Sequence, residues 1–235
     1  MSFYTRDRIT RDDFTSEYGR FYAKNDVERV TSARLKAMLL PKMTYEGGQM
    51  VQRWGFVRGQ LQHYGVQFDE SQFSGNGTLL LKKMLQAGKL DEVPEHIQIL
   101  KAQMHSDWLE SQSEEQLSGH PEWVLEKYFL DRSGKPDRKK TTTPIGIPYP
   151  CDSNHRTSQF REAVAKVSGL HNATEHGSKT QTIFLGWSKK DVDKAAKEHA
   201  GKEAQGFRPI SPFLVWNPGC AGVGRSTKHG KPRSC

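Results

Sequence analysis

Apolar residues in the first part of the chain recur at intervals that predict helices. Between Tyr4 and Leu40 the apolar positions follow the spacing of one helix face, and Pro41 ends the run. The positions that carry this pattern are Val27, Val30, Leu35, Met38 and Leu39. We therefore expect the chain to begin with helices.

Further stretches of the first half show the same spacing. Two helical patterns fall between Thr44 and Lys89 and are separated by the polar segment 67–77. An amphipathic pattern covers Pro94 to Leu109, and another covers Glu114 to Tyr128. Residues 1–130 are therefore predicted to be almost wholly helical.

The second half mixes a connecting segment with helices and strands. Residues 131–150 combine a basic run, a threonine triplet and prolines, which is typical of a linker or a long surface loop. Helical spacing follows over 153–167 and again from Ser188 to Ala204. Two short β-branched and aromatic runs, Thr180–Trp187 and Ile210–Trp216, predict buried strands.

Together these elements predict an α+β protein. Its N-terminal half, residues 1–130, is expected to be helical, and residues 131–150 connect it to a smaller C-terminal α/β unit over 151–216. That unit is expected to hold a short sheet and two helices. Residues 217–235 are rich in glycine and basic residues, which predicts a loose tail.

One segment of the first half has the order helix, extended stretch, helix. Residues 54–88 read WGFVRGQLQHYGVQFDESQFSGNGTLLLKKMLQAG. This segment resembles a SAP-type module, a short unit of proteins that contact DNA or RNA. The resemblance runs through Phe56, Leu61, Gly65, Val66, either Gly75 or Gly77, and Leu80, Leu81, Lys83 and Leu85. It departs from the family in a longer segment after Val66 and in having Asn76 or Thr78 where a basic residue is expected.

The same segment has a physical reason to bind phosphate. Gly75 and Gly77 precede a predicted helix, where the absence of a β-carbon allows a phosphate to approach the backbone amides closely. The cations that would then hold the nucleic-acid backbone are Arg53, Arg58, Lys82 and Lys83. The alternative is an ordinary helical hairpin whose glycines only form turns.

The charge is distributed unevenly along the chain. The net charge is +8, but residues 1–131 hold 16 basic and 19 acidic side chains, whereas residues 132–235 hold 19 basic and eight acidic ones. A strongly basic half attracts polyanions, of which nucleic acid is the most common in a cell. An acidic protein or a phosphorylated small molecule is compatible with the same charge.

The composition indicates a folded, intracellular chain. Apolar residues make up 34% of the 235 residues and the mean hydropathy is −0.76, but aromatic residues make up 10%. Disordered chains carry fewer aromatics. We expect neither a membrane-spanning helix nor a secretory signal, because no apolar run is long enough. Three cysteines without a C-x-x-C pair favour a reducing compartment, and a short basic run favours the nucleus if the source is a eukaryote.

Basic runs and aromatic residues of the second half supply further candidate contacts. The runs 132–140 and 225–233 are dense enough in cations to neutralise phosphates. Trp187 and Trp216 end the two predicted strands, where they would either stack on unpaired bases or belong to the core. The cations in these places are Lys135, Arg138, Lys139, Lys140, Lys189, Lys190, Arg225 and Lys228.

Two kinds of reactive site are compatible with the residues around the predicted α/β unit. Cys151, His155, His171 and His176 form a weak candidate zinc ligand set, and the alternative is that the histidines are surface or capping residues. Alternatively, Cys151 is a nucleophile that His171 or His176 activates. The glycine-rich string 219–227 lacks the spacing of a cysteine phosphatase loop but is compatible with anion binding.

These observations favour a nucleic-acid-binding protein that uses mainly phosphate contacts and has weak sequence specificity. One alternative is an enzyme that acts on nucleic acid or nucleotides at a site near Cys151, His155 and His171. Another is a protein-interaction module with an acidic partner.

Overall fold

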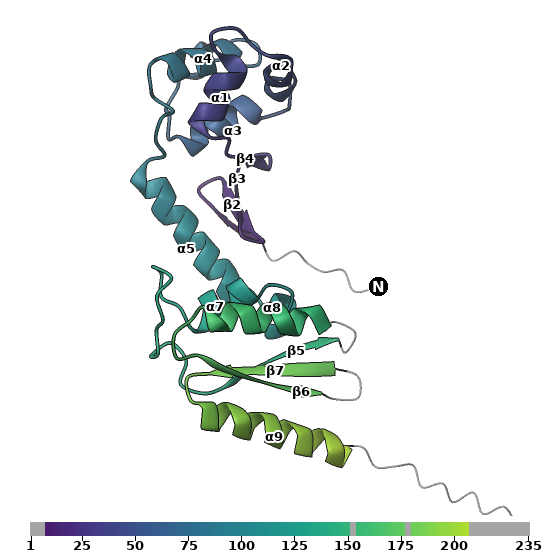
Figure 1. Cartoon of the computed structure of the whole chain (residues 1–235). Helices are drawn as coiled ribbons and strands as arrows, with labels where there is room; N and C mark the ends of the chain where they lie inside the picture. Colours follow the sequence, from purple (N-terminus) through teal and green to yellow (C-terminus); the bar gives the residue numbers. More distant parts are fainter. Residues whose placement is uncertain (1–7, 151–153, 177–179, 207–235) are drawn as a thin grey trace, which may run out of the picture.

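The chain begins with four short strands in an antiparallel meander (Figure 1). In the computed structural model, which describes residues 8–150, 154–176 and 180–206, the strands run in the order β1-β2-β3-β4. They are β1 (Ile9–Arg11), β2 (Phe14–Glu17), β3 (Arg20–Ala23) and β4 (Val27–Glu28). The pairs Asp12–Asp13 and Tyr18–Gly19 form two-residue loops in which every residue has a positive φ. Such loops follow the right-handed twist of the strands that they join.

The expectation of a wholly helical N-terminal half is therefore wrong. Strands of two to four residues are too short to show a clear period of two. The two-residue loops also lack the usual glycine signal, because three of their four residues are Asp12, Asp13 and Tyr18. The helical spacing that begins at Val27 marks a helix only from Ser32 onward. The chain is α+β, with a sheet at each end of the described residues.

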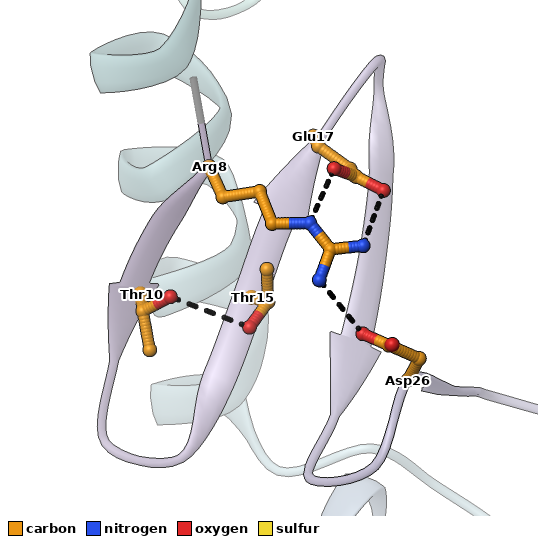
Figure 2. Close-up of polar contacts among 5 residues, drawn as sticks. All are labelled: Arg8, Thr10, Thr15, Glu17 and Asp26. Carbon is orange, nitrogen blue, oxygen red and sulfur yellow. Dashed lines mark hydrogen bonds and ion pairs between the residues drawn. The ribbon is translucent and has the colours of Figure 1, made fainter. Parts of the chain in front are cut away.

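An ion-pair network joins three segments of the meander (Figure 2). Arg8 Nε and Nη2 donate to the two carboxylate oxygens of Glu17 at 2.6 and 2.9 Å, and Nη1 donates to Asp26 Oδ1 at 3.2 Å. The Glu17 side chain is only 9% exposed. Because a two-pronged contact fixes the angle between guanidinium and carboxylate, Arg8 ties the first strand to β2 and to the turn before β4.

Four helices complete the N-terminal lobe, which we define as β1–β4 with α1–α4. They are α1 (Ser32–Leu39), α2 (Tyr45–Val51), α3 (Phe56–His63) and α4 (Thr78–Gln86), with a 3-10 turn at Glu70–Gln72. The side chains of Thr31 and Thr44 accept hydrogen bonds from backbone amides in the first turns of α1 and α2. The lobe is held by apolar side chains from all four helices and from the meander.

A long helix, α5 (Glu95–Ser111), joins the two lobes (Figure 1). Its buried residues divide between two cores, because Ile97 and Met104 pack in the N-terminal lobe whereas Trp108 and Leu109 pack in the C-terminal one. The helix predicted over 94–109 is thus confirmed.

The C-terminal lobe, which we define as α6–α9 with β5–β7, is a three-stranded sheet covered on both faces (Figure 1). The sheet order is β5-β7-β6, and both pairings are antiparallel. Ile183 and Leu185 of β7 belong to the core with α8, whereas Phe184 packs against Val192 of α9. The elements are α6 (Glu114–Leu117), α7 (Pro121–Tyr128), β5 (Ile145–Pro150), α8 (Asn154–Ala165), β6 (His171–His176), β7 (Thr180–Gly186) and α9 (Lys189–Gly206).

The second half contains two strands that the pattern did not predict. β5 lies within the expected connection 131–150, and its prolines at 148 and 150 are tolerated because it is an edge strand. β6 is a half-buried edge strand of largely polar sequence. The predicted strand Thr180–Trp187 is present as β7, whereas Ile210–Trp216 and the tail 217–235 lie outside the described residues.

The two glycines before α4 have different surroundings, and their alanine variants should separate two costs. Gly75 and Gly77 both have positive φ, but a β-carbon at Gly75 meets open space, whereas one at Gly77 would lie 2.4 Å from the Phe73 ring. We expect Gly75→Ala to cost about 1 kcal/mol through the backbone alone. Gly77→Ala should cost about 2 kcal/mol or more, because overpacking adds to the backbone cost. Urea denaturation of both variants measures the difference, and equal losses would contradict the packing of Phe73 on Gly77.

Candidate nucleic-acid interface

The start of α9 places two lysines at one end of the C-terminal sheet. Ser188 precedes the helix, and its hydroxyl accepts a hydrogen bond from the amide of Asp191 at 3.4 Å. Lys189 and Lys190 occupy the first turn and are exposed. The carboxylate of Asp191 in the same turn offsets one of these charges. The remaining positive charge adds to the positive end of the helix dipole and favours binding of an anion.

The basic segment 131–140 folds into a fixed loop at the edge of the same lobe. Asp131 Oδ1 accepts hydrogen bonds from the amides of Ser133 and Lys135 at 2.8 and 2.9 Å. The side chain of Ser133 donates to the same oxygen, and these bonds hold the pKa of Asp131 below its ordinary value. The amide of Asp137 then donates to the carbonyl of Phe129 at 2.8 Å, which returns the chain to α7.

Arg138 joins this loop to the start of α9. Its guanidinium carbon lies 5.6 Å from the centre of the Trp187 ring, and a β-carbon at Gly169 would come within 2.7 Å of its Nη2 atom. Trp187 directly precedes the helix cap, so Arg138 reaches the end of the sheet where Lys189 and Lys190 begin α9. The contact thus brings Arg138 next to the residues that precede α9, about 50 positions further along the chain.

Trp187 itself is used in packing. Its ring lies edge-on to Phe129 at 5.5 Å, and its indole nitrogen is buried without a hydrogen-bond partner among the described residues. Because Arg138 also contacts the ring, at 5.6 Å from its centre, Trp187 is engaged by the protein itself and is a poor candidate for stacking a base.

Several other predicted contacts have structural partners. Arg58 donates to both oxygens of Glu70, lowering the pKa of that carboxyl, and its guanidinium carbon lies 4.0 Å from the centre of the Phe73 ring. Lys140 Nζ donates to the carbonyls of Glu126 and Leu130, at the end of α7. These two cations stabilise loops and helix ends.

The remaining predicted cations are free of salt bridges within the described part of the chain. Lys135 and Lys139 are exposed on the loop 131–140, whereas Arg53, Lys82 and Lys83 belong to the N-terminal lobe. Trp216, Arg225, Lys228 and the string 219–227 lie outside the described residues, as does Cys151.

The histidines of the expected zinc set are not brought together. His171 pairs with Gly186 and His176 with Gln181, at opposite ends of β6. Five residue steps along a strand span about 17 Å, too far for one metal ion. α8 begins at Asn154, four residues after Pro150, and Pro150 pairs with Thr180 beside the Gln181–His176 pair. His171 lies at the other end of β6, so it is also remote from the expected site near His155. Among the described residues, no group of three or more metal-ligating side chains is present.

A cavity of about 770 Å³ between the meander, α3 and α5 contains a buried histidine that the sequence did not single out. His63 is 1% exposed, and its Nε2–H donates to the carbonyl of Val27 at 2.8 Å. Burial lowers the pKa of His63 to about 4, with a smaller contribution from Arg29 and Lys101. The residues lining this cavity include no serine, threonine or cysteine, so it offers no side-chain nucleophile of these types.

A second cavity of about 430 Å³ lies where the two lobes meet. The aromatic rings of Tyr18, Trp108 and Trp123 line it, and Arg156 contributes a cation. Trp108 and Trp123 contact each other directly, with ring centres 5.0 Å apart at 83°. This contact joins α5 to α7 and serves the packing of the lobes.

No protein family, curated protein or solved structure matches this chain. In the part of the chain that the structure describes, no helix is both long and apolar enough to cross a bilayer. The arrangement of cations at the end of the C-terminal sheet is therefore the basis on which a function can be argued.

Proposed function

We propose that this chain binds nucleic acid mainly through its phosphates. The observation that carries the proposal is the contact of Arg138 with Trp187, two residues before α9 begins at Lys189. Lys189, Lys190 and the helix dipole direct positive potential toward the same place, and Lys135 and Lys139 extend it along the loop. The basic balance of residues 132–235 adds a long-range attraction for a polyanion.

The proposed contacts imply weak sequence specificity. Lysine and arginine side chains on a surface loop and at a helix start reach phosphate oxygens, which carry no sequence information directly. We propose an intracellular site of action, in the nucleus if the source is a eukaryote.

Salt dependence of binding tests this proposal. We expect the chain to bind fluorescently labelled DNA or RNA with an affinity that falls steeply as salt rises, measured by fluorescence anisotropy. Lys189→Ala combined with Lys190→Ala should reduce the slope of log affinity against log salt by about 1.8 for duplex DNA, because each lost phosphate contact removes about 0.9.

A matched double variant provides the control. Lys24→Ala with Lys101→Ala removes the same charge from exposed positions outside the C-terminal lobe, and its slope should stay close to that of the unmodified chain. Equal losses in the two double variants would mean that net charge alone is responsible, and no binding at low salt would overturn the proposal.

A further inference from the structure

Trp54 is the most exposed large apolar side chain in the described part of the protein. It is 87% exposed, in the loop between α2 and α3. At this exposure most of its indole ring is open to solvent. Tryptophan is highly buried on average, so an uncovered ring suggests contact with another molecule.

The backbone around Trp54 is held in place. The amide of Phe56 donates to the carbonyl of Arg53 at 3.1 Å, which closes a tight turn around the tryptophan. Gly55 adopts a positive φ there and lies so close to Asn25 of the meander that a β-carbon would come within 2.6 Å of its side-chain nitrogen. The exposed ring is thus presented by an ordered turn, which lowers the entropic cost of binding.

The start of α4 lies next to the same turn. Asn76 Nδ2 donates to the carbonyl of Val51, at the end of α2, at 3.3 Å. Asn76 Oδ1 accepts from the amide and the hydroxyl of Thr78, which fixes the first turn of α4. Leu79 follows and is 76% exposed. Lys82 and Lys83 lie three and four positions further, on the side of the helix that Leu79 occupies.

The sequence around this surface is mainly basic, and the nearby carboxylates of Glu46 and Glu70 are paired with Arg34 and Arg58. We call Arg53, Trp54, Leu79, Lys82 and Lys83 the Trp54 patch. Residues 47–68 and 71–90 contain five cations and no acidic side chain. Within the described residues Arg53, Lys82 and Lys83 have no salt-bridge partner, unlike Arg58, which pairs with Glu70. The patch is therefore complementary to a polyanion.

We propose that the Trp54 patch binds single-stranded nucleic acid, with Trp54 stacked on an unpaired base. Stacking on an open ring requires a base that is free of a complementary strand, whereas the flanking cations contact the phosphates on either side. This inference rests on the proposed function, because it adds a base-stacking surface on the N-terminal lobe to the phosphate contacts of the C-terminal lobe. It implies that the preferred ligand is single-stranded.

Trp54→Ala tests the stacking directly. The probes are a labelled twelve-nucleotide oligo(dT), a matching oligo(U) and a twelve-base-pair duplex, each titrated with the full chain over a salt series. We expect Trp54→Ala to weaken binding of the single strands about tenfold or more, since stacking on an aromatic ring contributes that much per base. The duplex affinity should change less than twofold, and the melting temperature of the variant should match that of the unmodified chain.

The salt series separates stacking from charge. Trp54→Ala should leave the slope for single strands unchanged, because stacking releases no counterions, whereas Lys82→Ala with Lys83→Ala should lower it by about 1.4. Trp54→Phe keeps an aromatic face and should restore most of the single-strand affinity.

The outcomes distinguish this inference from the proposed function. If the unmodified chain binds none of the probes at low salt, the proposed function fails and the inference fails with it. If the chain binds, and Lys189→Ala with Lys190→Ala weakens binding, but Trp54→Ala binds single strands normally, only the inference is overturned. An equal loss for duplex and single strands in Trp54→Ala would likewise overturn it.

Discussion

Trp108→Ala is expected to lower the free energy of unfolding by about 3–5 kcal/mol, the usual cost of removing a large buried aromatic side chain. Trp108 is 1% exposed. Its ring lies 5.6 Å from Tyr18 in the β2–β3 loop and 5.0 Å from Trp123 in α7. One side chain of α5 thus packs against both lobes, so a cavity here weakens their contact as well as the core.

Urea denaturation followed by far-ultraviolet circular dichroism measures this loss. Most domains have a stability of about 5–15 kcal/mol, so the predicted loss is a large part of the total. The matched control is Trp54→Ala, which removes the same side chain from an exposed position and should change stability by less than about 0.5 kcal/mol. A loss below about 1 kcal/mol at Trp108 would contradict its position in the core.

The second large effect is a loss of stability in mild acid caused by His63. Its pKa is about 4 in the folded protein, mainly because burial disfavours the charged ring, compared with an ordinary value of 6.5. The unfolded chain therefore takes up the proton first as the pH falls. The stability is fully present above about pH 6.5 and is lost progressively down to about pH 4, for a total of about 3 kcal/mol.

Comparison with His63→Gln isolates this contribution from that of the carboxyl groups. Glutamine retains an N–H that can donate to the carbonyl of Val27 but does not titrate. We expect unfolding measurements between pH 7 and pH 4 to show a smaller loss in this variant than in the unmodified chain, by about 3 kcal/mol. His155→Gln, at an exposed position, should keep the full loss. Identical pH profiles for His63→Gln and the unmodified chain would show that His63 is not the group responsible.

Helices with many turns and one strongly apolar strand were predictable from local sequence. The apolar spacing behind α5, α8 and α9 extends over three or more turns, and β7 is a run of consecutive buried residues. The meander, β5 and β6 were not predictable in this way. Their strands are short, contain proline or are half exposed, and their stability comes from pairing with neighbours.

For the candidate sites, too, the sequence showed which residues are present but not how they are arranged. The cations of the segment 132–140 and of α9 are visible in the sequence, but their meeting depends on Arg138 reaching Trp187 across the lobe. The same packing showed that Trp187 is partly buried against the C-terminal core and that His171 lies far from His176. Trp54 had a weak signal in the sequence, as a tryptophan directly before a glycine and outside the apolar pattern of the flanking helices.

Local sequence was sufficient for the charge of the chain, for its longer helices and for the types of side chain available to bind phosphate, because these properties depend on residues close together in the chain. Packing between distant segments was needed to know which of those side chains are free. A tryptophan or an arginine has the same intrinsic chemistry everywhere, but Phe129 contacts the ring of Trp187 and Glu70 binds Arg58, whereas Trp54 and Lys189 are left open to solvent. Those neighbours come from other elements of the fold, so only folding decides which residues can meet a ligand.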